Sequence, residues 1–249
     1  MRLTTDGLVL ASLNMRETDR IVTILSNEAG VIRAYAGGAR KPGSRLCGST
    51  ELLSYSRFVL FKNRERYSVD SADTNKIFFG VRQDIEKFAL ASYLCELSAD
   101  TSPAEEKAPM QLQLLLNCLH LLETGRRTPD FLKPVFELRQ ISLSGYQPDL
   151  VACRSCGCYA GEDFRLLPGG GELLCGRCAQ QEGVREGLPL SPPVLAAMRH
   201  ILYSEAGKLF AFSLSEPSQR ELCMLSERYI QTQLSRSYRT LDFYHTLCG

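Results

Sequence analysis

The chain has 249 residues, of which 44% are hydrophobic, and a formal net charge of +1. These values are typical of a globular protein with well-formed cores, and the length favours more than one domain. The N-terminus has no apolar run of signal-peptide length, and no stretch is apolar enough to cross a membrane. The ten cysteines are therefore expected to be reduced thiols in the cytoplasm rather than disulfides.

The charge is spread unevenly along the chain. Residues 1–80 hold 12 Lys and Arg against 8 Asp and Glu, residues 81–152 hold 7 against 10, and the remainder hold 10 against 10. A polyanion is therefore expected to bind the N-terminal third. A solvated surface explains an excess of this size equally well, so the charge alone does not identify a partner.

The first 80 residues are predicted to form a β domain. Runs of apolar and β-branched residues predict five short strands, at Gly7–Ala11, Arg20–Ser26, Val31–Tyr35, Tyr55–Phe61 and Tyr67–Asp70. The connection Asn27–Gly30 is predicted to be a hairpin turn with the glycine at positive φ. Five short strands with an early basic loop are typical of an OB-type barrel, whose closure removes exposed sheet edges. The strand count alone also fits other five-stranded domains.

The segment from residue 37 to residue 45, called the basic loop below, is the strongest candidate for nucleic-acid binding. It reads Gly-Gly-Ala-Arg-Lys-Pro-Gly-Ser-Arg, with cations at Arg40, Lys41 and Arg45 and no apolar anchor. Such a segment stays exposed and offers cations and backbone N–H groups to phosphates without reading bases. Arg33 and Arg57, on neighbouring predicted strands, complete the predicted DNA-binding set.

Three tyrosines of the predicted strands, Tyr35, Tyr55 and Tyr67, are candidates for stacking on nucleobases. A tyrosine on a strand more often packs in a core. The basic loop is therefore the stronger of the two signals.

From residue 81 the hydrophobic periodicity becomes helical. Leu112, Leu115, Leu116, Leu119 and Leu122 follow the spacing of a buried helix face. Further helices are predicted over Ile85–Leu97, over Phe131–Ser144, from Ser191 onward and from about Pro217 to Ser237. We expect these helices to form one bundle within residues 81–249, from which residues 150–180 project as an inserted ribbon.

Two Cys-x-x-Cys pairs, Cys153/Cys156 and Cys175/Cys178, are separated by 18 residues, a spacing expected of a four-cysteine zinc site. Each pair folds two thiolates toward one point, and two pairs supply the tetrahedral sulfur set that Zn²⁺ prefers. Four protein ligands leave no open position for water, so one structural Zn²⁺ is predicted. A redox pair or unused thiols are the alternatives, and Cys158 is a fifth candidate ligand.

The last predicted helix is a candidate site for a protein partner. Its apolar residues Leu222, Leu225 and Tyr229 would line a groove. The groove would be edged by the arginines of the same segment, Arg220, Arg228 and Arg236. Because arginine binds carboxylates through paired hydrogen bonds, an acidic peptide ending in an aromatic residue and a free carboxylate would suit it. A solvated helix face is the alternative.

No catalytic constellation is recognised in the sequence. The three histidines, His120, His200 and His245, are far apart. No glycine-rich phosphate loop, nucleophile elbow or carboxylate cluster stands out. The chain is therefore expected to act by binding and not as an enzyme. A metalloenzyme, the rival interpretation, would hold its zinc with three protein ligands and an exchangeable water.

Several runs of the chain occur together in a familiar order and spacing. They are Gly7-Leu-Val-Leu, Glu17-Thr-Asp-Arg-Ile-Val-Thr, Gly38-Ala-Arg-Lys-Pro-Gly-Ser-Arg-Leu, Phe136-Glu-Leu-Arg and Ser144-Gly-Tyr-Gln-Pro-Asp-Leu, followed by both cysteine pairs. In these runs, which extend from residue 1 to about 180, the chain resembles the RecO family of bacterial recombination mediators. The resemblance becomes vague beyond the second cysteine pair.

The resemblance implies an α+β protein: an N-terminal OB-type β-barrel (residues 1–80) and an α-helical domain (81–249) with an inserted four-cysteine zinc ribbon (150–180). It also implies DNA repair and recombination without turnover, through binding of single- and double-stranded DNA, strand annealing, and help for RecA in replacing single-strand-binding protein. Implied partners are RecR, in some cases RecF, and the acidic C-terminal tail of single-strand-binding protein. The implied location is the bacterial cytoplasm, with the nucleoid. A zinc-ribbon RNA-binding or transcription-associated protein is the alternative.

Overall fold

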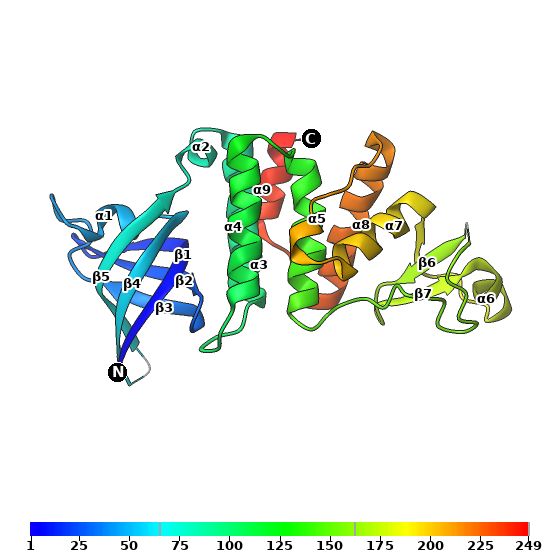
Figure 1. Ribbon diagram of the computed structural model, residues 1–249, viewed down its shortest axis with the longest axis horizontal. Coiled ribbons are helices and arrows are strands. Elements are labelled where there is room, and N and C mark those ends of the chain that lie inside the picture. The colour runs from blue at the N-terminus through cyan, green and yellow to red at the C-terminus, as the bar shows by residue number, and fades with distance from the viewer. Residues whose placement is uncertain (65, 162, 249) are drawn as a thin grey trace. The chain divides into compact units, whose positions relative to one another are not determined.

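The computed structural model describes residues 1–64, 66–161 and 163–248 (Figure 1). The chain divides into two compact units. The first comprises Met1–Arg127 together with the C-terminal residues from Tyr238 onward, and the second comprises Thr128–Ser237. Among the described residues, no helix combines the length and the apolarity needed to span a membrane.

The N-terminal strands form a closed five-stranded barrel, drawn in blue and cyan in Figure 1. They are β1 (Arg2–Met15), β2 (Asp19–Ser26), β3 (Gly30–Ala36), β4 (Ser54–Asn63) and β5 (Arg66–Ile77). They are hydrogen-bonded in the order β1-β2-β3-β5-β4, and only the short pairing of β3 with β5 is parallel. This arrangement confirms the predicted OB-type barrel.

The barrel core follows the alternation of side chains along the strands. On β3, Ile32 and Ala34 are buried whereas Arg33 and Tyr35 are exposed, because successive strand residues point to opposite faces. Gly30 has a φ of 56°, as predicted for the hairpin turn. A Cβ atom there would lie 2.0 Å from the carbonyl oxygen of Pro103, so this position accepts only glycine.

The strand β1 is longer than predicted at both ends, and its last part leaves the barrel core. Residues 11–15 are all exposed, yet they remain paired with β2 as far as the Met15–Asp19 pair. The alternation of apolar and polar residues that predicts a strand depends on the burial of one face of that strand. The alternation therefore stops where the burial stops. The β1–β2 hairpin therefore extends beyond the barrel core.

Helices complete the first unit. They are the one-turn α1 (Leu46–Ser49), α2 (Phe79–Arg82), α3 (Ile85–Thr101), α4 (Pro109–Thr124) and α9 (Arg239–Cys248). Asp84 caps α3 by accepting hydrogen bonds from two backbone N–H groups, and Gly125 ends α4 with a φ of 66°.

The helix α9 was not predicted, although Leu241 and Tyr244, three residues apart on one face of it, are both buried. It packs on α3, where the Tyr238 hydroxyl just before it donates to Asp100 at 2.7 Å. The Tyr238 and Tyr93 rings meet edge-on with centroids 5.8 Å apart. Tertiary contacts of this kind leave no local signal in the sequence.

The second unit holds the remaining helices and a small sheet. Its main helices are α5 (Pro129–Leu143), α7 (Pro192–Tyr203) and α8 (Glu216–Leu234). The ribbon consists of β6 (Phe164–Leu167), β7 (Glu172–Cys175), β8 (Leu188–Leu190) and α6 (Gly176–Gln181), with sheet order β7-β6-β8. The expectation of one bundle is wrong, because α3, α4 and α9 belong to the unit of the barrel.

A buried ion pair joins α5 to α8. The Lys133 ammonium lies 2.9 Å from the Glu137 carboxylate on α5 and 3.0 Å from Glu227 on α8. The Ser226 hydroxyl donates to Glu137 at 2.6 Å. Buried charges are costly unless they are paired and hydrogen-bonded, and this network supplies such partners to Lys133 and Glu137.

Candidate nucleic-acid interface and metal centre

The basic loop joins β3 to the short helix α1. The side chains of Arg40, Lys41 and Arg45 are all exposed. The only hydrogen bond from these side chains that the described residues reveal is a long one, 3.5 Å, from Arg40 to the carbonyl oxygen of Arg16. The cations of the loop therefore face solvent, where phosphates could reach them.

Asp19 holds the start of the basic loop. Its carboxylate accepts hydrogen bonds from the Gly38 backbone N–H, at 2.7 Å, and from the Tyr35 hydroxyl. The adjacent Thr18 carbonyl accepts from the Arg40 N–H at 2.8 Å. The Gly38 N–H and then the Tyr35 hydroxyl hold the pKa of Asp19 below its ordinary value. Asp19 is therefore ionised at neutral pH and fixes the loop to the β1–β2 turn.

Arg20 holds α1, the short helix that directly follows the far end of the basic loop. Its guanidinium donates to the Cys47 carbonyl oxygen at 2.8 Å and to the Thr50 hydroxyl at 3.0 Å. Asp19 and Arg20 are adjacent on β2 and point to opposite faces. Two neighbouring residues thus fix both ends of the loop. We call them the loop clamp, a role that no local sequence pattern indicates.

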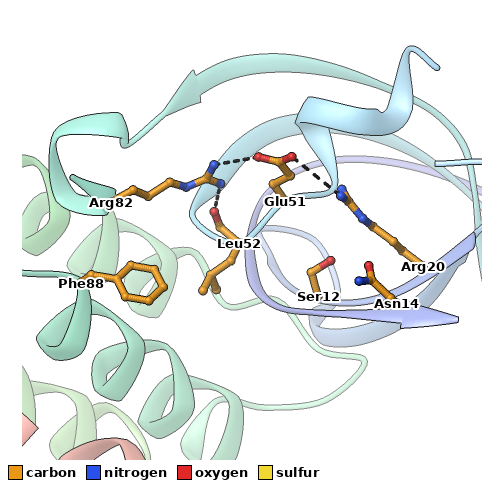
Figure 2. A pocket seen from close by; sticks show the side chains of 7 residues that line it. All are labelled: Ser12, Asn14, Arg20, Glu51, Leu52, Arg82 and Phe88. Atoms are coloured by element: carbon orange, nitrogen blue, oxygen red, sulfur yellow. Dashed lines mark hydrogen bonds and ion pairs between the residues drawn. The ribbon is translucent and has the colours of Figure 1, made fainter. Parts of the chain in front are cut away.

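Glu51 links the loop clamp to α2. Figure 2 shows its carboxylate between two guanidinium groups, 3.7 Å from that of Arg20 and 2.8 Å from that of Arg82. Arg82 also donates to the Leu52 carbonyl oxygen. The adjoining hollow, of about 440 Å³, is lined in addition by Ser12, Asn14 and Phe88. Because both guanidinium groups already bind Glu51 and backbone carbonyls, this cluster stabilises the joint between the barrel and α2.

A second hollow, of about 780 Å³, opens where β3 pairs with β5. We call it the β3–β5 groove. It is lined by Met15, Ile21, Arg33, Ala34, Tyr35, Asn63, Arg66, Tyr67 and Ser68. The structure thus brings together three of the predicted nucleic-acid contacts, Arg33 and Tyr35 of β3 and Tyr67 of β5. It adds Arg66, which was not among the predicted contacts.

The three candidate tyrosines differ in accessibility. Tyr35 is 37% exposed, whereas Tyr67 is only 8% exposed. Lys62 covers the Tyr67 ring, with its ammonium 5.1 Å from the ring centroid. Tyr55 is half-buried on β4 and is not part of the groove lining given above. Tyr35 is therefore the tyrosine that a nucleobase could approach.

Arg57 lies apart from the other predicted DNA contacts. It is exposed on β4, where its cross-strand neighbours are Asp6 on β1 and Asp73 on β5. Opposite charges at such positions attract one another. The charge of Arg57 is therefore offset locally, and the basic loop and Arg33 remain the stronger contacts for an anion.

The apolar groove predicted on the last long helix is absent from the described part of α8. Leu222, Leu225 and Tyr229 are at most 1% exposed, because α8 packs against α5. The Tyr229 hydroxyl also donates to the carbonyl oxygen of Tyr146 at 2.9 Å. A core-facing helix stripe and a docking groove have the same periodicity, so the sequence could not distinguish them.

The outward side chains of α8 form a different surface. Arg220, Met224 and Arg228 are exposed and spaced four residues apart, so they share one face of the helix. The Met224 side chain is 64% exposed. Arg236 is also exposed, beyond the end of α8. The structure thus places the predicted arginines at the surface, with a methionine instead of a groove between two of them.

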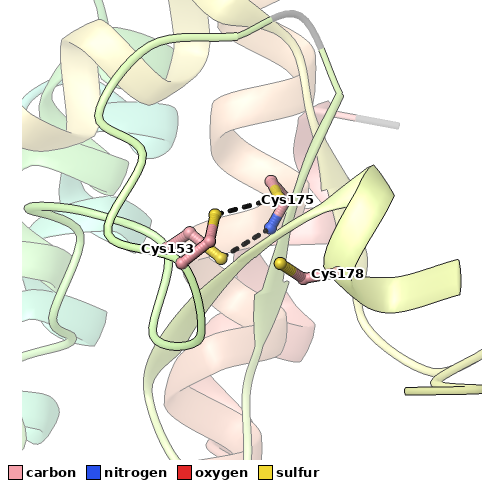
Figure 3. A group of neighbouring side chains, drawn as sticks. Cys153, Cys175 and Cys178 are labelled. Atoms are coloured by element: carbon pink, nitrogen blue, oxygen red, sulfur yellow. Dashed lines mark hydrogen bonds between the residues drawn. The ribbon is translucent and has the colours of Figure 1, made fainter. Parts of the chain in front are cut away.

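The four cysteines of the two pairs converge on one point. The Sγ atoms of Cys153, Cys156, Cys175 and Cys178 all lie within 4.8 Å of one another, and Figure 3 shows three of them side by side. The Sγ atoms of Cys156 and Cys175 are 3.7 Å apart. A tetrahedral site with Zn–S bonds of about 2.3 Å needs sulfurs about 3.8 Å apart. The group therefore fits a metal ion with four sulfur ligands.

The backbone conformation shapes the turns at the two cysteine pairs. Gly157 has a φ of 70°, and its N–H donates to the Cys153 carbonyl oxygen at 2.9 Å. The Cys175 N–H donates to the Cys153 Sγ at 3.4 Å. At Gly176 a Cβ atom would lie 1.8 Å from the Asp163 carboxylate. Gly157 is thus favoured by its positive φ, whereas a side chain at position 176 would require the exposed Asp163 side chain to move.

The thiols of this group influence one another. The backbone N–H of Cys158 lowers the pKa of Cys156 to about 6, so Cys156 is largely a thiolate at neutral pH, the form that binds metals. The hydrogen bond to this thiolate, followed by burial, raises the pKa of Cys178 to about 12. A cation is therefore needed before all four can ionise together. Cys158 lies outside the converging group of described cysteines.

The loop clamp carries a first prediction. Asp19→Ala should speed amide hydrogen exchange at Gly38 and Arg40, because it removes the acceptor that fixes the start of the basic loop. Asp73→Ala, which removes an exposed carboxylate of β5, is the matched control and should leave the loop unchanged. Identical exchange in Asp19→Ala and the parent protein would disprove the clamp.

The clamp also has a predicted pH dependence. Because the pKa of Asp19 is lowered, its stabilising effect is complete above the ordinary value of 3.8 and is lost as the pH falls through the lowered value. After correction for intrinsic exchange, protection of the Gly38 amide should be constant from pH 5 to pH 7.

Known proteins resemble this chain over its whole length. The family model described as Recombination protein O N terminal matches residues 1–78, and the one described as Recombination protein O C terminal matches residues 82–242. The DNA repair protein RecO of Acetivibrio thermocellus is 37% identical over 247 residues, which are 98% of this chain and 97% of the relative. Proteins of the same name from Symbiobacterium thermophilum and Desulforamulus reducens are 32% and 33% identical, over 97% and 96% of this chain and 96% and 92% of theirs. The chain therefore belongs to the RecO family of DNA repair proteins.

Proposed function

We propose that this protein binds single- and double-stranded DNA through its barrel and anneals complementary strands. With RecR, and in some settings RecF, it helps RecA replace single-strand-binding protein on DNA. The observation that carries the proposal is the basic loop, three exposed cations held at both ends on an OB-type barrel of a RecO-family chain. The protein acts by binding, without catalytic turnover, in the bacterial cytoplasm with the nucleoid.

In this proposal the parts of the chain have separate roles. Residues 1–80 are the DNA-binding domain, and residues 81–249 carry partner contacts, with residues 150–180 as an inserted zinc ribbon. The phosphate contacts are Arg33, Arg40, Lys41 and Arg45, with Arg57 at the periphery. The metal is one structural Zn²⁺, supported by the sulfur spacing of the four cysteines.

The geometry of the basic loop suits strand annealing. Cations that contact phosphates release condensed counterions and lower the repulsion between two strands. Phosphate contacts carry no base information and leave the pairing edges of the bases free. A loop that is clamped at its ends but exposed along its length can therefore hold two strands near each other while they pair.

We place the acidic tail of single-strand-binding protein on the exposed face of α8. Arg220 and Arg228 would pair with carboxylates of the tail. Met224, between them on the same face, would contact an aromatic side chain through its polarisable sulfur. Arg236 would extend the basic surface beyond the end of the helix.

Strand annealing without nucleotide tests both proposals together. The protein should anneal complementary strands that are naked or coated with single-strand-binding protein. The double substitution Arg220→Glu with Arg228→Glu should slow annealing of coated strands about 5- to 30-fold, because each of the two exposed charge contacts contributes roughly 0.5–1 kcal/mol. Annealing of naked strands should not change.

The outcomes separate the two proposals. Lys208→Glu, at another exposed position of the second unit, is the control for charge reversal and should slow neither reaction. Equal slowing on naked and coated strands would remove the partner site from α8. Failure of the parent protein to anneal naked strands would overturn the proposed function.

A further inference from the structure

The β3–β5 groove combines apolar, aromatic and cationic side chains. Met15 and Ile21 of the β1–β2 hairpin lie on its wall, together with Tyr35, and the groove measures about 780 Å³. Arg33 and Arg66 line it as well, and both are exposed. The described residues that line it include no carboxylate. Its lining therefore complements a planar, largely apolar group that is attached to negative charges.

Tyr35 is held rigidly in this groove. Its hydroxyl donates to the buried carboxylate of Asp19, so the free rotation of the ring is already restricted. A Cβ atom at Gly37 would lie 3.3 Å from the edge of the Tyr35 ring, which shows that the basic loop begins against this ring. A stacking surface that is fixed before binding loses little conformational entropy when a ligand arrives.

We infer that the β3–β5 groove binds an unpaired nucleobase of a single strand. Tyr35 stacks on the base, Met15 contacts it through its side chain, and Arg33 and Arg66 bind the flanking phosphates. This inference rests on the proposed DNA binding and makes it more specific. A base inside a duplex is already stacked on both faces, so the groove favours single strands, whereas the basic loop accepts either form.

The test compares two strands with the same phosphates. One is an oligomer of dT, whose bases stack little on one another, and the other is an abasic strand of equal length. The parent protein should bind the dT strand roughly tenfold more tightly, as expected for one stacked base. Tyr35→Ala should bind both strands equally, whereas Tyr35→Phe, which keeps the ring, should retain the preference.

Two further measurements guard against a general loss of structure. Tyr35→Ala should bind duplex DNA of the same length as tightly as Tyr35→Phe does, because both variants lack the hydroxyl that donates to Asp19. Arg66→Gln should weaken binding to the dT and abasic strands by the same factor, because it removes a phosphate contact and no stacking surface. Duplex affinity that falls together with single-strand affinity in Tyr35→Ala would overturn the assignment.

The outcomes distinguish this inference from the proposed function. Equal binding of dT and abasic strands by the parent protein overturns the base site but leaves phosphate binding by the basic loop intact. A preference that survives in Tyr35→Ala places the bases elsewhere and also overturns it. Failure to bind either strand overturns DNA binding itself.

Discussion

Replacing Arg40, Lys41 and Arg45 together by alanine is expected to weaken single-strand binding by about 100-fold at 0.1 M salt. Each lost phosphate contact on a single strand removes about 0.7 from the slope of log K against log salt. Three lost contacts should therefore flatten that slope by about 2. The loss should be the same for all sequences, because phosphate contacts read no bases.

The control for this variant removes equal charge from elsewhere in the same unit. Arg2, Lys107 and Arg126 are exposed cations outside the basic loop, and their replacement by alanine should change the slope little. Both triple variants should keep the parent unfolding temperature, since most exposed substitutions alter stability by roughly 0.5 kcal/mol or less. Wild-type affinity and an unchanged slope in the loop variant would move the DNA site to another part of the chain.

The barrel could be predicted because its strands bury one face, and burial of one face leaves a period of two residues in the sequence. The limits of that signal are visible on β1, whose residues 11–15 are paired but exposed. The α9 helix shows a second limit of prediction from local sequence, which concerns contacts between distant residues. It is placed by contacts of Tyr238 with residues of α3, which are distant in sequence.

The candidate DNA site could be predicted only where the amino-acid composition of a segment determines by itself that the segment is exposed. Apart from Ala39, which is buried, the basic loop has no apolar residue to bury, so the exposure of its cations followed from its sequence. The loop clamp depends on Asp19 and Arg20 reaching backbone groups 19 and 27 residues away, which no local pattern encodes. Similarly, Tyr35 and Tyr67 both lie on strands, and only the packed structure shows that Lys62 covers the second.

The α8 helix shows how a correct pattern led to a wrong site. The predicted apolar stripe exists, with Leu222, Leu225 and Tyr229 on one face. However, that face is used for packing against α5. A helix in a globular unit usually buries its apolar stripe in its own core, so the exposed face, with Met224, is where a partner remains to be sought.

The cysteine ligands are the clearest case of local prediction. Two residues separate the thiols within each pair, and this spacing alone brings them to one point. The structure was needed to exclude Cys158, which is close in sequence to Cys156 but does not join the converging group of described cysteines.

Cys175→Ser is expected to remove the metal and unfold the ribbon while leaving the barrel folded. The three ribbon strands have only three or four residues each, too few to be stable without further support. Structural Zn²⁺ supplies roughly 10–16 kcal/mol of binding free energy in small zinc modules at neutral pH. Most of the stability of the ribbon should therefore depend on the metal.

Metal analysis and amide hydrogen exchange check this prediction together. The parent protein should contain one Zn²⁺ per chain, and Cys175→Ser should contain almost none. Exchange at Leu166 and Leu173 in the ribbon should approach that of an unfolded segment. Exchange in the barrel core around Ile24 and Phe58 should not change, because these residues belong to the other compact unit.

Cys158→Ser is the matched control, since it removes a neighbouring thiol that lies outside the converging group of described cysteines. It should retain one Zn²⁺ and the full protection of the ribbon. If Cys158→Ser lost the metal while Cys175→Ser kept it, the ligand set would have to be reassigned. If the parent protein contained no zinc and chelators left ribbon exchange unchanged, the four cysteines would not be a structural metal site, and the ribbon would have to be stable through packing of its leucines alone.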